Sequence, residues 1–166
     1  MIAIVAVDNE FGIGCENDLL YSIPEDMQFF KEKTMNKVVV MGYATLISLP
    51  NSKPLKNRTN IVLVKEQDVK IEGATVVHSI EELLEETEKY SKDDVFVMGG
   101  GQVYAQLLPF CHKAFITKIK GMKKADTFFP NIDQMSNWKI ATASEEKQHE
   151  EFTFTFNTYV NDCVKT

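Results

Sequence analysis

The sequence predicts an α/β fold with a central, twisted and mostly parallel sheet of about eight strands, an antiparallel C-terminal edge and helices on both faces. Four short runs rich in valine and isoleucine are almost continuously apolar, which is typical of strands covered on both faces. Helical patterns separate these runs, so crossover connections and parallel pairing are expected. Near the C-terminus, the run Phe152–Phe156 alternates strictly between aromatic and polar residues, which indicates an added antiparallel strand.

The strand candidates fall into two groups along the chain. The valine- and isoleucine-rich runs are Ile2–Val7, Val38–Met41, Asn60–Val64 and Val95–Met98. After Pro109 come Ala114–Ile119, Trp138–Ser144 and Glu151–Val160, with no clear helix between them. The second group therefore predicts the antiparallel edge of the sheet.

Three segments carry helix signals. Pro24–Thr34 begins with a proline, which suits the first turn of a helix. Thr45–Leu49 is short and is ended by Pro50. Ser79–Tyr90 begins with Ser79 followed three residues later by Glu82, the pattern of a capping box.

Length and composition suit one self-sufficient domain over residues 1–166. With 44% hydrophobic residues, the chain has enough apolar surface for a core without disulfide or metal support. The formal charge of −6 argues against binding to nucleic acid. No apolar stretch reaches the ~20 residues of a membrane helix, and the apolar N-terminal run lacks the basic region of a signal peptide. We therefore expect a soluble, cytoplasmic protein that does not bind membranes.

The cysteines and histidines give no metal or nucleophilic site. Cys15, Cys111 and Cys163 are far apart and lack the spacing of zinc ligands, so we expect free thiols and no bound metal. The three histidines form no recognisable catalytic arrangement with a serine or cysteine.

The first candidate for chemistry is Asp26. On a helix that begins at Pro24, Asp26, Met27 and Phe30 share one face, so a carboxylate would lie against an apolar wall. This segment alone leaves two interpretations open. Asp26 either simply favours the positive end of the helix, or is buried beside Met27 and Phe30, where its pKa would rise and it would pair with a donor-rich ring.

Two glycine-containing turns and one long loop are further candidates. Gly99–Gly101 stands between a strand and a helix, where bare backbone and free N–H groups suit a phosphate, and Met41–Thr45 repeats the arrangement. Neither turn is a dinucleotide or P-loop fingerprint, so each could also be only a tight turn. The loop Asp8–Ile23 is long for a small domain, which favours a lid or binding loop.

Taken in order, these segments resemble the dihydrofolate reductase family, of the bacterial type. The similarity covers about residues 1–161 and rests on an ordered set of motifs. They are Gly12–Gly14 with Asn17, Ile23–Pro24 with Asp26 and Phe30, Val40–Gly42 with Thr45, Pro54–Leu55 with Arg58, Met98–Tyr104, and Asp126–Pro130.

This resemblance implies hydride transfer from NADPH to C6 of 7,8-dihydrofolate with protonation at N5, which gives tetrahydrofolate for one-carbon metabolism. It implies that Asp26 binds the pterin ring nitrogen and amine, supported by the Thr117 hydroxyl through water. It implies that Arg58 binds the α-carboxylate of the glutamate, a task that suits a bidentate guanidinium. The remaining substrate residues that it implies are Ile4, Val5, Leu19, Met27, Phe30, Leu49, Leu55 and Met98. Folate-like inhibitors are expected to bind the same pocket, and a monomer is expected.

For NADPH, the resemblance implies backbone contacts to the nicotinamide from Ala6 and Ile13, and a pyrophosphate cradle from Thr45 and Gly99–Gly101. A cis peptide between Gly99 and Gly100 is also implied. The other cofactor residues implied are Gly14, Gly42, Tyr43, Ala44, Val64, Lys65, Gln102, Val103 and Tyr104.

The chain departs from the family pattern in two places. Tyr21 stands where the family usually has a tryptophan that helps to hold a water near the carboxylate, and we expect the phenol to serve the same catalytic role. Tyr43, Ala44 and Gln102 replace residues that are often basic, which removes positive charge from the site expected for the 2′-phosphate of NADPH. Lys65 is the best remaining partner of that phosphate.

Two alternatives to this function differ in class. One is a reductase of similar fold that acts on the pyrimidine- or pterin-like ring of a riboflavin-type pathway. Asp26 and Arg58 argue against it, because they suit the two ends of a folate. The other is a non-catalytic nucleotide-binding module, which the pairing of Asp26 with Thr117 disfavours.

Overall fold

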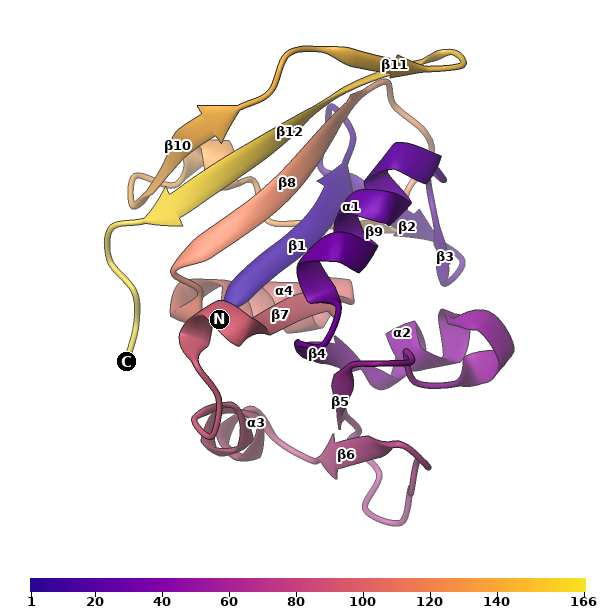
Figure 1. Cartoon of the computed structure of the whole chain (residues 1–166), viewed down its shortest axis with the longest axis vertical. Coiled ribbons are helices and arrows are strands. Elements are labelled where there is room, and N and C mark those ends of the chain that lie inside the picture. Colours follow the sequence, from indigo (N-terminus) through magenta and orange to yellow (C-terminus); the bar gives the residue numbers. More distant parts are fainter.

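The computed structural model describes residues 1–166 and is built on one large twisted sheet (Figure 1). The strand order is β10-β12-β8-β1-β7-β4-β5-β6, with the short β11 paired to β12. The strands of this sheet are β1 Ile2–Val7, β4 Val38–Gly42, β5 Thr59–Leu63, β6 Ala74–Val77, β7 Val95–Gly99, β8 Lys113–Lys120, β10 Trp138–Ala143, β11 Lys147–His149 and β12 Phe152–Asn161. From β8 to β6 all neighbours are parallel, whereas β12 is antiparallel to β8 and to β10. The predicted mixed sheet with an antiparallel C-terminal edge is therefore confirmed.

Four α-helices connect or flank these strands. They are α1 Pro24–Thr34, α2 Tyr43–Ser48, α3 Ile80–Thr87 and α4 Gly101–Leu107. The bounds predicted for α1 are correct. The helix predicted at Thr45–Leu49 begins earlier, at Tyr43, directly after β4. The helix α3 begins one residue later than predicted because Ser79 is its N-cap, where the side chain accepts the Glu82 N–H, and it ends at Thr87 instead of Tyr90. Single turns of 3-10 helix lie at η1 Pro50–Ser52, η2 Lys92–Asp94, η3 Leu108–Phe110 and η4 Ile132–Gln134.

The apolar strands bury both faces, because alternate side chains enter two separate cores. Ala3, Val40 and Val97 point into a core that α3 and α4 cover with residues such as Leu83 and Leu107. Their neighbours Ile2, Ile4, Val39, Met41 and Phe96 point to the other face, where Leu46 of α2 and the α1 residues Phe29 and Phe30 pack. Figure 1 shows α1 in front of the sheet and α4 behind it. Helices on both faces were predicted, and this arrangement confirms them.

The loop Asp8–Ile23 contains secondary structure that the sequence did not predict. Its segments β2 Gly12–Cys15 and β3 Asp18–Leu19 form a small second sheet with β9 Thr127–Phe128. The turn between β2 and β3 places Glu16 and Asn17 at positive φ, and the Glu16 N–H donates to the Asp126 carboxylate at 2.9 Å. A segment more than a hundred residues away therefore shapes this loop.

The strand β6 was also missed by the sequence prediction. It has four residues, of which Val77 alone is buried, so its apolar signal is too short to recognise.

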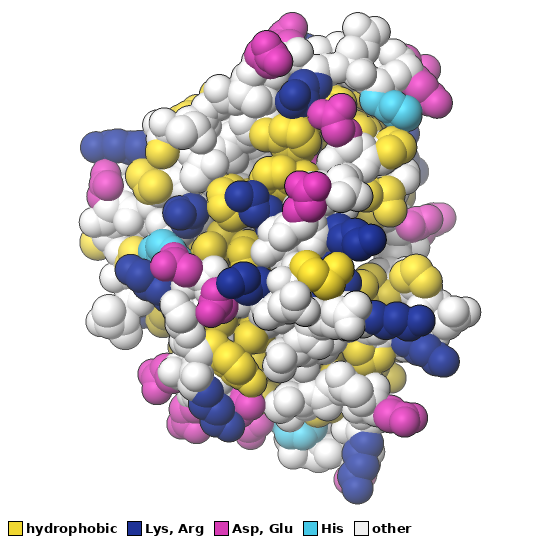
Figure 2. Space-filling model, viewed as in Figure 1, with side chains coloured by type: hydrophobic (Ala, Val, Ile, Leu, Met, Phe, Trp, Pro, Cys, Tyr) yellow, Lys and Arg dark blue, Asp and Glu magenta, His cyan; other side chains and the backbone are white.

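At the outer surface, positive and negative side chains are interspersed with apolar atoms (Figure 2). None of the helices is long and apolar enough to cross a membrane.

Candidate active site

Asp26 lies in the first turn of α1 and faces β8 of the sheet. Thr117 of β8 donates its hydroxyl to Asp26 Oδ1 at 2.6 Å, although the two residues are 91 positions apart. Thr117 is itself buried, in register with Ala6 of β1 and Phe156 of β12. Burial raises the pKa of Asp26 above its ordinary value, and the Thr117 hydrogen bond opposes this rise only in part. A partly buried carboxyl group with one protein donor retains lone pairs for a ligand.

Most of the apolar side chains predicted to bind the substrate lie on one face of the sheet, the face that α1 covers. Five of them belong to or pack against the core beneath α1 and α2, namely Ile4, Phe30, Leu49, Leu55 and Met98. Val5 packs against the opposite core. Met27 and Leu19 are 58% and 75% exposed, respectively, which is unusual for such large apolar side chains. The structure thus offers an open apolar wall beside the one partly buried acid of α1.

Tyr21 has a different partner from the one expected. Its hydroxyl donates to Asp8 Oδ2 at 3.1 Å, and its ring packs edge-on against Phe152 at 5.4 Å between centroids. Burial and this hydrogen bond raise the pKa of Tyr21 to about 12, so the phenol stays protonated and donates. The hydroxyl expected to hold a water near Asp26 thus gives its hydrogen to Asp8, and the catalytic role of Tyr21 stays a prediction. The side chain reaches Asp8 because the phenolic oxygen extends beyond the ring, in the direction of the loop that follows β1.

The glycine turns after β4 and β7 meet at the carboxyl edge of the sheet. A Cβ atom on Gly99 or Gly100 would lie 3.1 or 3.3 Å from Thr45 Oγ1, and one on Gly42 would lie 3.1 Å from Val103. Gly99 has a φ of +145°, which side-chain-bearing residues rarely adopt, and the Gly99–Gly100 peptide is cis as the resemblance implied. Thr45 and Gly99–Gly101 thus form one concave stretch of backbone with a hydroxyl group, which fits a pyrophosphate.

The loop at β2 and β3 lies beside this cradle. Asn17 Nδ2 donates to the Ala44 carbonyl at 3.0 Å and ties the loop to α2. The Leu20 N–H donates to the Ile13 carbonyl at 3.3 Å, and the Asp126 N–H to the Gly14 carbonyl at 3.0 Å. Ala6 packs with Tyr21 in a third, small cluster. The residues expected at the nicotinamide therefore lie where the loop meets β1.

The residues expected near the far end of the cofactor differ in exposure. Three of them are exposed, namely Ala44, Lys65 and Gln102, and Tyr43 is half-buried. Val64 is buried, and its N–H donates to the Val77 carbonyl at 2.9 Å. Val103 and Tyr104 lie in the core. The Tyr104 hydroxyl donates to the Ile4 carbonyl at 2.7 Å, so this group is already paired within the protein.

Arg58 lies at the opposite end of the apolar wall, beside the C-terminal end of α1. Its Nε donates to Thr34 Oγ1 at 3.3 Å and its Nη1 to the Lys56 carbonyl at 2.8 Å. No carboxylate in the chain forms an ion pair with it. The guanidinium is thus held by neutral groups and keeps its charge for a ligand.

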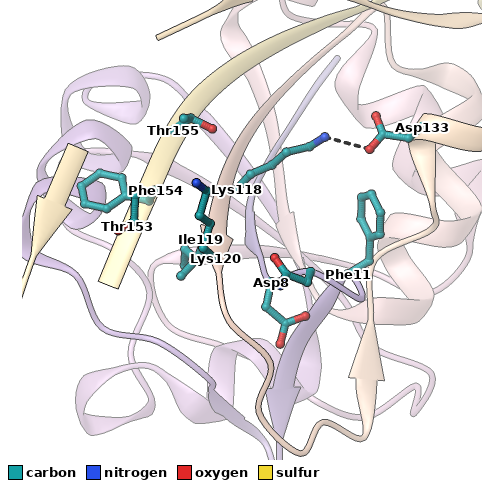
Figure 3. Close-up of a pocket in the computed structure, with 10 residues that line it drawn as sticks. Asp8, Phe11, Lys118, Ile119, Lys120, Asp133, Thr153, Phe154 and Thr155 are labelled. Atoms are coloured by element: carbon teal, nitrogen blue, oxygen red, sulfur yellow. Dashed lines mark hydrogen bonds and ion pairs between the residues drawn. The ribbon is translucent and has the colours of Figure 1, made fainter. Parts of the chain in front are cut away.

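A separate hollow of about 280 Å³ lies on the other face of β8 and β12 (Figure 3). Lys118 points into it and is ion-paired with Asp133 at 2.7 Å, and Tyr159 also donates to Asp133. Along β8 the side chains alternate, so Thr117 faces α1 whereas Lys118 faces this hollow. Its charges are already paired, so the surroundings of Asp26 are the better candidate for chemistry.

The sequence matches one family over almost its whole length. A family model described as dihydrofolate reductase covers residues 1–161. The chain belongs to the dihydrofolate reductase family. The fold and family expected from the sequence are therefore confirmed, and with them the enzyme class, an oxidoreductase that reduces dihydrofolate with NADPH.

Individual relatives agree with this assignment. The dihydrofolate reductase of Bacillus subtilis is 35% identical over 147 residues, which cover 89% of this chain and 84% of that protein. The one from Neisseria gonorrhoeae is 37% identical over 144 residues, covering 87% and 86%. Among solved structures, dihydrofolate reductase from Enterococcus faecalis complexed with NADP(H) and RAB-propyl superposes with a TM-score of 0.87 at 37% identity, covering 97% of this chain and 95% of that one.

Two side chains that hold predicted site residues in place were not themselves predicted. Thr34 is fully buried and bonds to Arg58, and Asp8 is 4% exposed and bonds to Tyr21. A threonine near the end of a helix and an aspartate after a strand are both common, so the sequence gives no signal for either role. Their partners lie 24 and 13 residues away, respectively, and only the fold brings them together.

Proposed function

We propose that this chain reduces 7,8-dihydrofolate to tetrahydrofolate with NADPH, using residues of α1, β8 and the cradle after β4 and β7. The observation that carries the assignment of the site is the Asp26–Thr117 pair at 2.6 Å, next to an open apolar wall. An acid with a raised pKa in such surroundings suits the nitrogen-rich edge of a pterin, which offers two donors to one carboxyl group.

At the pterin end, Asp26 would bind the ring nitrogen and the exocyclic amine. The charged carboxylate strengthens these hydrogen bonds and makes protonation of the ring more favourable, because it stabilises positive charge that develops there. Thr117 donates to Asp26 Oδ1, which fixes the orientation of the carboxyl group and leaves Oδ2 for the substrate. Met27 and Phe30 would contact the faces of the ring and exclude water.

At the cofactor end, the concave backbone at Gly99–Gly101 and Thr45 would hold the pyrophosphate of NADPH. When bound, the nicotinamide supplies the hydride. The residues of this chain orient it: Ala6 and Ile13 offer backbone groups where the loop meets β1, and Asn17 holds the loop against α2. Lys65 is the cation best placed for the 2′-phosphate, since Ala44 and Gln102 carry no charge.

At the glutamate end, Arg58 would bind the α-carboxylate of the substrate. Two of its five N–H groups are used by Thr34 and Lys56, which leaves three for a carboxylate. The distribution of charge thus matches a folate, with an acid for the basic ring at one end and a cation for the carboxylate at the other.

We further propose that the enzyme works as a monomer in the cytoplasm, where Cys15, Cys111 and Cys163 remain free thiols. Its partners are then small molecules: dihydrofolate, NADPH and folate-like inhibitors. Sedimentation equilibrium of the purified chain would give the mass of one chain, and a stable dimer would contradict this part of the proposal.

The experiment that tests the function is an assay of dihydrofolate reduction with NADPH and NADH side by side. We expect turnover with both and a higher kcat/KM with NADPH. Lys65→Ala should lower the NADPH value about tenfold and leave the NADH value unchanged, because one charged contact to phosphate is lost. Absence of turnover with either cofactor would contradict the function, whereas an unchanged NADPH to NADH ratio in Lys65→Ala would remove only Lys65.

A further inference from the structure

Arg58 is the only arginine in the sequence, and the rest of the 18 lysine and arginine residues are lysines. Lysine and arginine carry the same charge, but only the guanidinium offers parallel N–H groups in a fixed plane. An arginine is therefore most informative where the direction of its hydrogen bonds matters. This raises the question of what fixes the direction of this side chain before a ligand arrives.

The backbone that carries Arg58 is held on both sides. The Asn36 N–H donates to the Asn57 carbonyl at 2.8 Å, and the Thr59 N–H donates to the Lys37 carbonyl at 2.9 Å. The buried amide of Asn60 donates to the Arg58 carbonyl at 3.2 Å. The backbone is thus fixed beside the end of α1, and the remaining freedom lies in the torsion angles of the side chain.

Thr34 limits that remaining freedom. Its side chain is fully buried in the last turn of α1, and its hydroxyl hydrogen is donated to the Phe30 carbonyl at 2.8 Å. Because that hydrogen is used, the oxygen faces Arg58 as an acceptor and receives the Nε–H at 3.3 Å. The Lys56 carbonyl takes one hydrogen of Nη1 at 2.8 Å.

These two bonds select which edge of the guanidinium is free. The Nε–H points to Thr34 and cannot join a bidentate contact. A bidentate contact through Nη1 and Nη2 remains, because Nη1 gives only one of its two hydrogens to Lys56 and Nη2 gives none. We infer that Thr34 is a positioning residue, which holds the Nη1–Nη2 edge of Arg58 toward the α-carboxylate of the substrate. This inference rests on the proposed role of Arg58 and goes beyond it, because it assigns specificity for the glutamate to a residue that does not touch the substrate.

The test compares two substrates that differ only at this end. One is dihydrofolate, and the other is the same dihydropterin with its aminobenzoate but without glutamate. Thr34→Val keeps the shape of the side chain and removes the acceptor. We expect it to raise the KM for dihydrofolate about five- to tenfold, with kcat and the KM of the truncated substrate unchanged, because only an oriented contact to a charged group is weakened. Thr34→Ser keeps the hydroxyl and should restore the KM for dihydrofolate to within about twofold of the wild-type value.

Arg58→Gln calibrates the experiment. It should abolish most of the preference for dihydrofolate over the truncated substrate, and Thr34→Val should add nothing in this background. If Arg58→Gln left the preference unchanged, the proposed role of Arg58 itself would be wrong. If Arg58→Gln removed the preference but Thr34→Val changed both substrates equally, Thr34 would be only structural and the inference alone would be overturned.

A second measurement uses only the wild-type protein, so it does not depend on whether a variant folds. Because Arg58 is the only arginine, its Nε–H gives a single signal in protein labelled with ¹⁵N-arginine. In the wild-type protein without substrate, we expect this group to be rotationally restrained and its exchange with solvent to be slowed. A freely rotating, rapidly exchanging Nε–H that becomes ordered only when substrate binds would contradict the inference.

Discussion

Two aspartates of this enzyme are buried or partly buried, and the protein donates very different numbers of hydrogen bonds to them. Asp8, directly after β1, accepts four hydrogen bonds, from the N–H groups of Glu10, Gly12 and Lys123 and from the Tyr21 hydroxyl. Asp26, in the first turn of α1, accepts one side-chain hydrogen bond, from Thr117. A carboxylate has about four acceptor sites, so Asp8 is saturated whereas Asp26 is not.

The difference separates a structural acid from a functional one. Asp8 ties the two ends of the loop 8–23 to each other and to the segment at Lys123, whose ammonium group also donates to the Leu20 carbonyl. Gly12 is part of this arrangement, since a Cβ atom there would lie 3.1 Å from both Asp8 oxygens. Asp26 keeps lone pairs free in partly buried surroundings, where burial raises its pKa. A carboxyl group left short of donors by the fold is prepared for donors from a ligand.

The largest expected effect is on turnover in Asp26→Asn. The amide keeps the size of the side chain but lacks the charge that promotes protonation of the pterin. We expect kcat near neutral pH to fall about 10²- to 10³-fold while NADPH binding is retained. The loss should be smaller in acid, where the substrate is already protonated. Steady-state rates between pH 5 and 8, with NADPH affinity from fluorescence titration, check both points.

The next effect is on stability in Asp8→Asn. The amide nitrogen that replaces one oxygen cannot accept hydrogen bonds from the donors that face it, so we expect the free energy of unfolding to fall by about 1–3 kcal/mol. Urea denaturation measures this change. Asp26→Asn is the matched control, because Asp26 accepts only one side-chain hydrogen bond and the amide oxygen of asparagine can still accept it. Equal stability of Asp8→Asn and the wild type would remove the structural role assigned to Asp8.

A smaller effect is expected in Tyr21→Phe, which removes one of the four donors to Asp8 and keeps the ring. The free energy of unfolding should fall by about 0.5–1.5 kcal/mol. Turnover near neutral pH should change less than about twofold, because the hydroxyl bonds to Asp8 and not to Asp26. A loss of turnover comparable with that of Asp26→Asn would instead restore the catalytic role that the sequence suggested for Tyr21.

The smallest effect concerns the stability of Asp26→Asn itself. Because burial raises the pKa of folded Asp26 above its unfolded value, the folded state binds this proton more tightly. The stabilisation from this group is complete below the unfolded pKa and is lost as pH rises through the folded pKa. Asp26→Asn should therefore be slightly more stable than the wild type at neutral pH, with the difference vanishing in acid. Thermal denaturation across that range measures it, and a variant less stable at neutral pH would argue against burial of a charged group.

Much of the fold could be predicted because its signals are local. Val38–Met41 and Val95–Met98 are continuously apolar and are strands in the centre of the sheet, and Pro24 marks the first residue of α1. The small sheet of β2, β3 and β9 could not be predicted from local signals. Its strands are very short, and their pairing depends on contacts between Gly12–Cys15 and Thr127–Phe128.

The residues of the site could be predicted only where the chain keeps the residues that the family has at these positions. Asp26, Thr117 and Arg58 were expected from the resemblance, and the structure brings Thr117 and Asp26 into contact. The direction of a side chain was not predictable where the chain departs from the family. Tyr21 turns toward Asp8, and this choice depends on the position of a carboxylate that has no distinctive sequence signal.

Direct titration of Asp26 tests the central claim, that this carboxyl group is held partly buried and short of donors. The carboxyl carbon of Asp26, assigned in ¹³C-aspartate-labelled protein by comparison with Asp26→Asn, would be followed by NMR across the acidic pH range. The account predicts a pKa above the ordinary aspartate value in the free enzyme, and a further rise in Thr117→Val, which loses the one donor. An Asp26 pKa at or below the ordinary value, unchanged by Thr117→Val, would contradict it.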